Sequence, residues 1–378
     1  MNLNRGGRRI DWTELDMAEK TKKLLFFISN LGAGGAQRSL MTTTEALHRC
    51  YGIEVYVASW PEKGDKFSVP DGVEFIDLGT YSRHSNGKMN YFHAVYTIRQ
   101  AVRQLRPDWV VATMSDMYMR TFLGCIGLPV HLMVWEHTSM GRKLHLESRI
   151  ARKCFYRFAD LVLVLTNKDL RQVAGKYKHV DVMPNPLSFP VFTGTAQREN
   201  IVVAIGRLDV WYVKGFDRLI SMWAKVCRLH PSWRLMIVGE GNNENTQHIR
   251  KMLEEHHVED SVVLAGYRTD VQDILRHSKV FVLPSRVEGF PMCLVEAMSQ
   301  GCACVSFSMQ GAVKDIIRDG EDGFIIDDNK EDAFAQVLSD LLSDDVKMNQ
   351  LAECAINNIN RFTPERIAGL WKNLVDSV

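Results

Sequence analysis

Short apolar runs alternate with amphipathic stretches along the whole chain. In the first half the apolar runs predict strands at Leu24–Ser29, Ile53–Ser59, Val73–Leu78, Trp109–Met114, His131–Trp135 and Leu161–Leu165. Between them a helix is predicted over Tyr91–Arg106, where Val95, Ile98 and Val102 lie on one stripe. Strands separated by helices form parallel sheets with helical crossovers. The first half is therefore predicted to be an α/β domain.

The same alternation restarts after a polar run at Thr193–Asn200, which we interpret as a linker. Strands of the second half are predicted at Ile201–Ile205, Arg234–Val238, Ser261–Leu264, Val280–Leu283, Cys304–Ser306 and Gly323–Ile326. A helix is predicted near Lys330–Leu342. Thr363-Pro364-Glu365 is typical of a helix start and predicts a last helix that runs to about Leu374.

Two such halves predict an α/β fold of two Rossmann-like, doubly wound domains that face each other across a cleft. We place the first domain at residues 21–190 and the second at 200–360. A terminal helix at 361–378 is expected to pack back toward the first domain, and residues 1–20 are expected to form a flexible extension. Ligands bind beyond the carboxyl ends of the strands in such sheets, so both domains can direct loops into one cleft.

Glu288 and Glu296 stand eight positions apart, around a mostly apolar run. Pro291 suits the first position of a helix, where its missing N–H costs nothing, so Glu288 is predicted in a strand-to-helix loop and Glu296 on the helix. The free amides that begin at Gly289 then form an anion site suited to phosphate oxygens. Carboxylates beside such a site can accept hydrogen bonds from sugar and ribose hydroxyls, which indicates a nucleotide-sugar site. An isolated pair of this kind is more often two solvated acids.

Two further loops carry candidate phosphate ligands. Gly206 and Arg207 follow a predicted strand, and Lys214 stands just before a helix. A guanidinium and an ammonium can neutralise a leaving diphosphate without a metal. The glycine-rich residues 32–35 follow the first strand, where they form either a phosphate-approaching loop or a plain tight turn. No acid ends the second strand, which disfavours an NAD-linked dehydrogenase.

The chain resembles the family-4 glycosyltransferases, retaining enzymes of the GT-B fold. The resemblance rests on the Glu-x7-Glu pair, on the Gly-Arg and Lys-Gly elements, and on the glycine-containing runs 301–306 and 311–326. It covers most of the chain and is strongest over residues 201–327. The sequence departs from the family at 310–315, where Gly-Gly-x-x-Glu is common, so the resemblance does not specify the sugar.

The resemblance also implies roles for individual residues. Arg207 and Lys214 would hold the donor diphosphate, backbone at Gly35 would approach a phosphate, and His137 would face the transferred sugar. A lone histidine is otherwise more often a packing residue. Glu136 is a candidate on the acceptor side. The predicted catalytic set is His137, Arg207, Lys214 and Glu288. The predicted donor-binding set is Gly34, Gly35, Gly206, Arg207, Lys214, Gly239, Tyr267, Arg268, Glu288, Gly289, Phe290, Pro291, Leu294 and Glu296.

Composition narrows the class of protein. The 378 residues are 46% hydrophobic and 24% charged, as in a soluble globular protein, and the net charge of +1 argues against a nucleic-acid partner. The eight cysteines show no zinc-ligand spacing and are expected to be reduced and buried. No apolar run reaches the roughly 18 residues of a membrane-spanning helix. These features predict a cytoplasmic protein.

A stretch in the first half suggests contact with a membrane. Between Arg142 and Phe158, apolar residues recur every four positions and basic residues fall between them. The apolar positions are Leu146, Ile150, Cys154 and Phe158, and the basic ones are Arg149, Arg152, Lys153 and Arg157. A basic amphipathic helix can lie on the anionic inner face of the cell membrane. The same stripe could instead pack on the sheet with its basic face in water.

The resemblance implies a retaining glycosyltransferase that moves a hexose or N-acetylhexosamine from a nucleotide-diphosphate sugar, by family frequency a UDP-sugar. The expected acceptor is a glycan, lipid-linked, in the assembly of lipopolysaccharide, O-antigen, capsule or another oligosaccharide. No cofactor and no metal are expected. The alternatives on the same fold are a nucleotide-sugar epimerase and an inactive nucleotide-sugar-binding protein. A phosphorylase of this architecture would use pyridoxal phosphate and is usually much longer.

Overall fold

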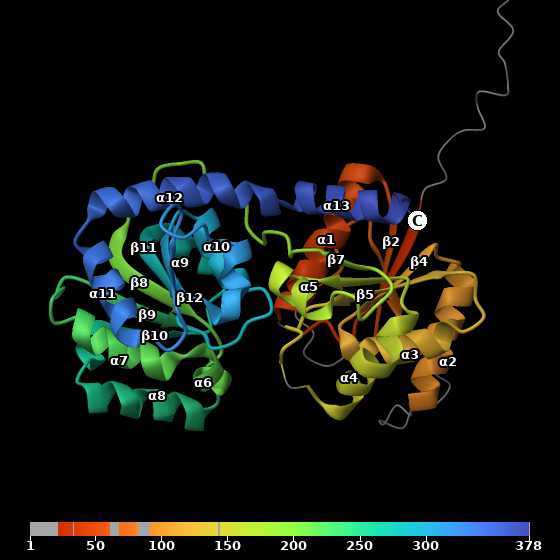
Figure 1. Cartoon of the computed structure of the whole chain (residues 1–378), viewed down its shortest axis with the longest axis horizontal. Helices are drawn as coiled ribbons and strands as arrows, with labels where there is room; N and C mark the ends of the chain where they lie inside the picture. The colour runs from red at the N-terminus through yellow and green to blue at the C-terminus, as the bar shows by residue number, and fades with distance from the viewer. Residues whose placement is uncertain (1–21, 33, 61–67, 82–90, 143, 378) are drawn as a thin grey trace, which may run out of the picture.

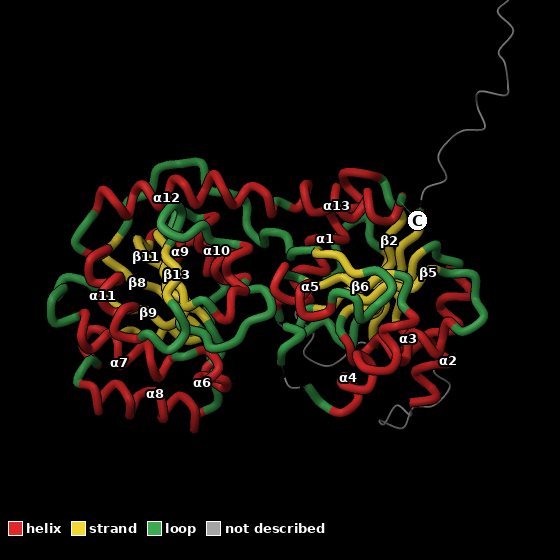
Figure 2. The backbone as a smooth tube through the Cα atoms, in the orientation of Figure 1, coloured by secondary structure: helices red, strands yellow, loops and turns green. Residues whose placement is uncertain are grey.

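The computed structural model describes residues 22–32, 34–60, 68–81, 91–142 and 144–377, which form two α/β domains side by side (Figure 1). The predicted extension at 1–20 lies outside the described residues. In each domain a parallel sheet is enclosed by helices (Figure 2). The predicted fold class, two doubly wound domains, is confirmed.

The first sheet has seven parallel strands. Their order across the sheet is β3 (Glu74–Asp77), β2 (Glu54–Ser59), β1 (Lys23–Phe27), β4 (Trp109–Thr113), β5 (His131–Glu136), β6 (Leu161–Val164) and β7 (Val180–Val182). Its helices are α1 (Gly35–Tyr51), α2 (Tyr91–Leu105), α3 (Ser115–Cys125), α4 (Leu146–Ile150) and α5 (Asn167–Val173). Helices on both faces bury the central strands completely, which explains the continuous apolar run from Leu24 to Phe27.

The second sheet has six parallel strands. Their order is β10 (Val262–Gly266), β9 (Arg234–Val238), β8 (Glu199–Ile205), β11 (Ser278–Leu283), β12 (Ala303–Phe307) and β13 (Phe324–Ile326). Its helices are α6 (Trp211–Lys214), α7 (Phe216–Val226), α8 (Asn243–His256), α9 (Val271–His277), α10 (Met292–Ser299), α11 (Glu331–Leu342) and α12 (Asp345–Ile359). The strand order reverses direction between β1 and β4 and between β8 and β11, the places where such sheets bind ligands.

The chain returns to the first domain at its end. Helix α12 runs along the second domain, and α13 (Pro364–Asp376) crosses over and packs on α1 (Figure 1). Trp371 on α13 is fully buried, with ring centroids 5.5 Å from Phe26 and 5.1 Å from Trp135. The predicted return of the terminal helix to the first domain is confirmed.

The predicted amphipathic helix over residues 142–158 is broken. After α4 the chain forms a π-helical turn at Ala151–Phe155 and a 3-10 turn at Tyr156–Phe158. Tyr156 and Arg152 are buried, whereas the apolar stripe faces outward, with Leu146 68% and Phe158 54% exposed. The stripe therefore does not pack on the sheet, and Arg152 is not a surface cation.

Two further expectations concern the whole chain. Among the described residues, no helix combines the length and the apolar character needed to cross a membrane. All eight cysteines are free, as expected, and Cys302 and Cys304 are buried in β12 and the turn before it. Three others, Cys50, Cys154 and Cys354, lie on the surface, so the expectation that the cysteines are buried is wrong for them.

Candidate functional site

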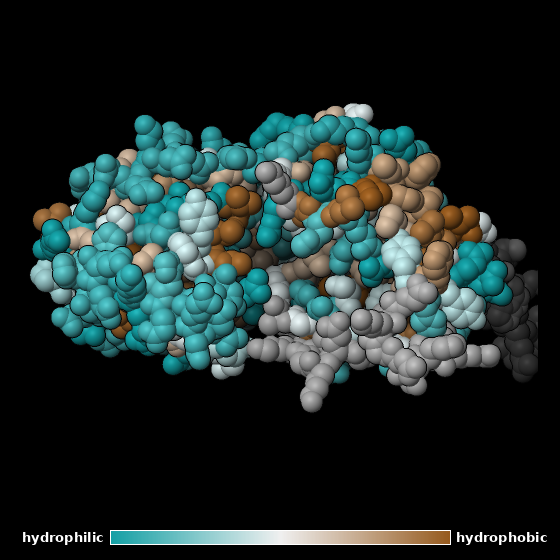
Figure 3. Space-filling view, turned by 90° about the horizontal axis from the view of Figure 1, so that it is seen from below, coloured by the Kyte–Doolittle hydropathy of each residue, from teal (hydrophilic) through white to brown (hydrophobic). Residues whose placement is uncertain are grey.

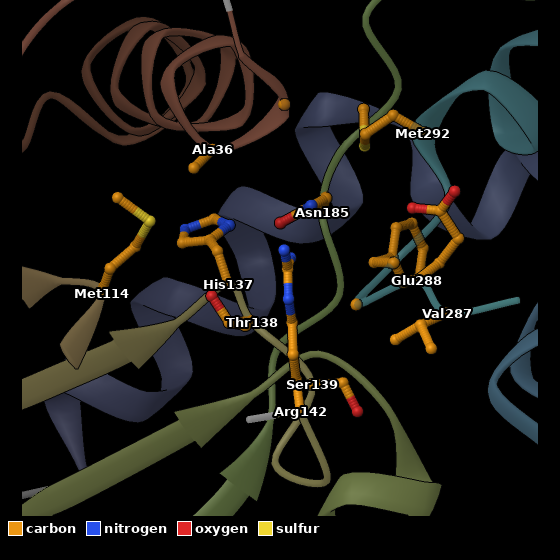
Figure 4. Close-up of a pocket in the computed structure, with 13 residues that line it drawn as sticks. Ala36, Met114, His137, Thr138, Ser139, Arg142, Asn185, Val287, Glu288 and Met292 are labelled. Carbon is orange, nitrogen blue, oxygen red and sulfur yellow. The ribbon is translucent and has the colours of Figure 1, made fainter. Parts of the chain in front are cut away.

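A pocket of about 200 Å³ lies between the two domains, at the carboxyl ends of the strands. The first domain contributes His137 and Gly35, and the second contributes Glu288, Gly289 and Phe290. In Figure 4, His137 and Glu288 face the pocket from opposite sides. Residues that are far apart in the sequence, and that were predicted separately, therefore share one cavity.

Glu288 is held from the second domain by two donors. Its Oε1 lies 2.8 Å from Nζ of Lys214 and 2.7 Å from Oγ of Ser285. Burial lowers the pKa of Lys214, but the neighbouring Glu288 carboxylate outweighs this and the net pKa is raised. Lys214 therefore stays charged, and within the described residues Oε2 of Glu288 has no bonded partner. One carboxylate oxygen is left for a ligand.

The loop that carries Glu288 is fixed from beneath. Arg218 on α7 donates from Nε to the Pro284 carbonyl (2.6 Å) and from Nη2 to the Ser285 carbonyl (2.7 Å). Arg286 forms a two-bond pair with Asp217, with N–O distances of 2.7 and 2.8 Å. Such pairs are geometrically specific, so the carboxylate of Glu288 is presented on a rigid loop.

Amides and cations meet beside Glu288. Within the described residues no acceptor is bonded to the amides of Gly289 and Phe290, which precede α10. Pro291 is the cap of this helix, one position before its first residue. Arg207 is exposed and close enough to Lys214 to oppose its charge, which lowers the pKa of Lys214 slightly against the net rise. The arrangement can bind an anion through backbone and side chains together.

Two glycines allow the loops to approach. A Cβ on Gly289 would lie 2.5 Å from the carbonyl oxygen of His137, so the two domains touch at this point only because the side chain is absent. A Cβ on Gly239, whose φ is +147°, would lie 1.9 Å from the carbonyl oxygen of Gly206. The loops after β8 and β9 are thus packed backbone to backbone.

His137 is an unpaired imidazole at the pocket wall. Both ring nitrogens are shielded from solvent and have no hydrogen-bond partner among the described residues. Its ring centroid lies 4.2 Å from that of Trp135. Burial lowers the pKa of His137 to about 3, so the ring is neutral at physiological pH. A buried polar group without a partner is costly, and a ligand hydroxyl could satisfy it.

The expectation that Glu136 serves an acceptor is wrong. Its side chain is 1% exposed and both oxygens are engaged inside the first domain. Oε1 accepts from the Thr138 amide (2.9 Å), and Oε2 accepts from Arg152 Nε (3.0 Å) and from the Tyr156 hydroxyl (2.7 Å). Arg152 also donates to the Thr138 carbonyl (2.9 Å) and to the Ser139 carbonyl (3.2 Å). Glu136 therefore shapes the His137 loop from behind.

Glu296 lies on α10 as predicted and is 4% exposed. Its Oε1 is 2.8 Å from Nη1 of Arg38, at the start of α1 in the other domain. Gly35, in the same turn, also faces α10, and a Cβ there would lie 3.6 Å from Met292. The glycine-rich loop at residues 32–35 and helix α10 therefore lie next to each other across the cleft.

Other residues that were predicted to bind the nucleotide-sugar donor lie outside the pocket. Leu294 is fully buried, and its amide donates to the Pro291 carbonyl (3.0 Å). Tyr267 is 53% exposed, and Arg268 is paired with Asp270 at 2.5 Å. None of these side chains lines the pocket, and their predicted roles stay predictions.

Several residues that line the pocket were not predicted as site residues from the sequence. Arg142, Asn185 and Met114 line the cavity, and Figure 4 shows Arg142 and Asn185 between His137 and Glu288. Asn185 accepts from Ser39 Oγ (2.9 Å) and is flanked by prolines, a signal that could have marked it. Met114 has a φ of +78°, which is unusual for a residue with a side chain and leaves no mark in the sequence.

No site for a resident metal is evident in the part of the chain that the structure describes. There, no three side chains of His, Cys, Asp or Glu gather closely enough to hold an ion. Positive charge is supplied by Arg142, which lines the pocket, and by Lys214 and Arg207 beside it. What the arrangement offers chemically is an anion site, a carboxylate with one free oxygen and a neutral imidazole.

Comparison with known families assigns both halves of the chain. The sequence model described as Glycosyltransferase Family 4 matches residues 33–188, and the one described as Glycosyl transferases group 1 matches residues 189–358. The chain belongs to the family-4 glycosyltransferases. The enzyme class predicted from the motifs is thereby confirmed.

Individual relatives align over nearly the whole glycosyltransferase. An uncharacterized glycosyltransferase of Haemophilus influenzae is 27% identical over 364 residues, covering 94% of this chain and 100% of the relative. A Campylobacter jejuni enzyme is 26% identical over 369 residues, with 94% and 99% coverage. Its name is GalNAc-alpha-(1->4)-GalNAc-alpha-(1->3)-diNAcBac-PP-undecaprenol alpha-1,4-N-acetyl-D-galactosaminyltransferase.

A solved structure shows the same fold. The Anabaena protein HepE, crystallised with UDP and glucose, superposes on this glycosyltransferase with a TM-score of 0.78. The two share 18% identity, and the match covers 94% of this chain and 100% of HepE. The likeness therefore concerns the GT-B architecture.

Proposed function

We propose that this glycosyltransferase moves a hexose or N-acetylhexosamine from a UDP-sugar to a lipid-linked glycan, with retention at the anomeric carbon and without a metal. The observation that carries the proposal is the meeting of His137, Glu288 and the α10 amide site in one interdomain pocket. UDP is bound by the structural neighbour HepE, and the Campylobacter relative is named for a diphospho-undecaprenol-linked acceptor.

The charges in and beside the pocket support the following reaction. The bond between the sugar C1 and the β-phosphate oxygen breaks, while Arg207, Lys214 and the α10 amides stabilise the leaving diphosphate. A new bond forms from the acceptor oxygen to C1 on the same face, and the acceptor proton passes to the leaving phosphate. The free oxygen of Glu288 holds a sugar hydroxyl, and neutral His137 bonds another without adding positive charge near C1.

Variants of the ion pair at Glu288 test the site. Glu288→Gln and Lys214→Met should each lower turnover by about 10²-fold, the cost of losing one group that acts in the transition state. Lys225 and Asp332 offer a matched control, because they form an exposed pair at 2.5 Å on the same domain. Lys225→Met should keep wild-type turnover. Wild-type turnover in Glu288→Gln would overturn the assignment.

Substrate and metal are tested on the wild-type protein. A panel of nucleotide sugars is supplied with EDTA, and release of the nucleotide diphosphate is measured with and without a polyprenyl-diphosphate-linked glycan. We expect UDP-sugars to be used, release to rise with the acceptor, and EDTA to have no effect. Conversion of the donor into an epimeric nucleotide sugar, without release of nucleotide diphosphate, would favour the epimerase alternative. NMR of the new linkage should show the anomeric configuration of the donor, and the opposite configuration would exclude retention.

We further propose that the stripe at 146–158 docks on the anionic membrane that carries the acceptor. Leu146, Ile150 and Phe158 are exposed beside the exposed cations Arg149, Lys153 and Arg157. Figure 3 views the molecule from below and shows hydrophobic side chains among hydrophilic ones on both domains. Apolar insertion and attraction to acidic lipids both favour such a surface, each basic residue adding about 1 kcal/mol.

Vesicle binding tests whether the exposed stripe at 146–158 binds an anionic membrane. Reversing Arg149, Lys153 and Arg157 to glutamate should abolish sedimentation with vesicles that contain anionic lipid, and Arg152 must be left intact because it is buried. The control reverses Arg228, Arg250 and Lys251, which are exposed on the second domain and change the charge equally. Equal recovery of both triple variants would show that the stripe does not dock.

A further inference from the structure

An ion pair crosses the cleft beside the pocket. Arg38, in the first turn of α1, contacts Glu296 on α10 with a distance of 2.8 Å between Nη1 and Oε1. The Glu296 side chain is 5% exposed and that of Arg38 is 41% exposed. Within the described residues, no other side chain is bonded to this carboxylate, and Oε2 has no bonded partner. The pair thus fixes one oxygen of Glu296 and leaves the second available.

Arg38 does not serve its own helix. A cation near a helix N-terminus is repelled by the helix dipole, and the first turn of α1 contains no acidic residue to offset it. Its favourable partner is Glu296 in the other domain. An almost completely buried carboxylate in turn requires a partner, because an unpaired charge in such a place is strongly unfavourable.

Other contacts already hold the domains together. Asn167 donates to the Asp315 carboxylate from its backbone N–H (2.6 Å) and from its side-chain Nδ2 (3.0 Å). Lys168 donates to the Met309 carbonyl at 3.2 Å. The backbones also meet at Gly289. An additional interdomain contact at Arg38 would therefore add little to the stability of the domain arrangement. Its partner Glu296, however, lies one turn beyond the α10 amides and so next to the proposed diphosphate site.

We propose that Arg38 is a positioning residue for the donor. It holds Oε1 of Glu296 from across the cleft, so that Oε2 is aimed at the ribose hydroxyls of the nucleoside diphosphate. Recognition of the ribose then requires both domains, because the carboxylate is supplied by one and oriented by the other. This inference rests on the proposed function as a nucleotide-sugar enzyme and on the sequence expectation that Glu296, the second carboxylate of the pair, accepts hydrogen bonds from ribose hydroxyls.

The test compares ribose recognition in matched variants. Calorimetry measures binding of UDP and of its 2′-deoxy and 3′-deoxy analogues to the wild type, Arg38→Met, Arg38→Lys and Glu296→Gln. The control is Arg49→Met, which removes an arginine of the same helix whose 2.6 Å pair with Glu365 lies away from the pocket. The deoxy analogues should bind the wild type roughly tenfold or more weakly than UDP.

We expect Arg38→Met to bind UDP about as weakly as the deoxy analogues, so that the discrimination ratio falls toward one. Arg38→Lys should recover part of the ratio, and Arg49→Met should keep all of it. An equal loss of affinity for UDP and the analogues would mean that Arg38 contacts the diphosphate instead. Tighter UDP binding in Arg38→Met would show that the pair competes with ribose. Either result overturns the inference.

Failure of the proposed function looks different. If the wild type does not distinguish UDP from its deoxy analogues and Glu296→Gln binds normally, Glu296 does not bind ribose at all. A second outcome is that the wild type and Arg38→Met both bind UDP more tightly than the deoxy analogues, whereas Glu296→Gln does not. In that case only the role of Arg38 is wrong. Should Arg38→Met fail to fold, an unchanged ratio in Arg38→Lys together with normal donor turnover would still count against it.

Discussion

Arg152 in the first domain and Arg218 in the second each stabilise a loop of the pocket through hydrogen bonds to its backbone. Each is buried, and each donates to carbonyl oxygens of the loop that carries a pocket residue: the His137 loop for Arg152 and the Glu288 loop for Arg218. Their charges are balanced differently. Arg152 is paired with the buried Glu136, whereas Arg218 stacks 3.7 Å over the Phe307 ring.

The pKa values follow this difference. Burial lowers the pKa of Arg152, but Glu136 outweighs it and the net pKa is raised. For Arg218, burial and then Arg286 lower the pKa to about 10. The first loop is therefore held by a neutral pair and presents a neutral imidazole. The second loop is held by a cation that has no directly bonded carboxylate among the described residues, and it adjoins the proposed diphosphate site. Charge balance around the two loops therefore differs between the domains.

The largest loss of stability is expected at Arg152, because its charge directly neutralises the buried Glu136 carboxylate. Arg152→Met should lower the free energy of unfolding by about 3–5 kcal/mol, because it strands a buried carboxylate. Urea unfolding checks this. The double variant Glu136→Gln/Arg152→Met should lose less than Arg152→Met alone, and a double variant that is as unstable as the sum of both single ones would contradict the neutral-pair interpretation.

A smaller effect is expected in the second domain. Arg218→Met removes two hydrogen bonds to carbonyl groups but strands no carboxylate, so it should lower the free energy of unfolding by about 1–3 kcal/mol. The same urea titration measures it. Arg218→Lys should recover part of the loss. A penalty as large as that of Arg152→Met would show that the two arginines are equally neutralised.

The neutral imidazole predicts a pH dependence of stability. The pKa of His137 is about 3 when folded and about 6.5 when unfolded. Between these values the unfolded chain binds the extra proton, so the stability that His137 contributes is present above about pH 6.5 and lost as pH falls. Wild type should lose about 1 kcal/mol more than His137→Asn between pH 6.5 and 5.5. Parallel curves would mean that the ring is protonated in the folded state.

The smallest effect is expected at the exposed contact between the domains. Asn167→Ala removes the exposed side-chain hydrogen bond to Asp315 and keeps the one that the backbone N–H of residue 167 donates, so it should change the free energy of unfolding by less than about 1 kcal/mol. Donor turnover should also stay within twofold of wild type, since the Arg38 and Gly289 contacts remain. A large loss of turnover would place the control of domain closure at this contact.

The strands and the Glu288 loop could be predicted because their causes are local. A buried parallel strand is apolar throughout, and each predicted strand is found within two residues of its expected ends. Gly289 and Pro291 mark the transition from strand to helix. The partnership of Glu296 with Arg38 could not be predicted, because the two residues are 258 positions apart and nothing in either local segment requires the other.

The expectation of one regular helix over 142–158 is wrong for a different reason. Its four-residue spacing fits a regular α-helix, but the π-helical turn at Ala151–Phe155 rotates the later residues relative to the earlier ones. The packing of Ala151 and Tyr156 and the pairing of Arg152 with Glu136 determine which side is buried. Periodicity alone identified an amphipathic segment and left open which side is buried.

The return of α13 has a consequence for the order in which the protein is made. Trp371 and Val375 are fully buried in the first domain, and the indole of Trp109 donates to the Val375 carbonyl at 3.4 Å. Domains usually fold as they leave the ribosome, the N-terminal one first. Here the core around Phe26 and Trp135 stays incomplete until α13 has emerged. We expect the second domain, although translated later, to be the first to finish its core.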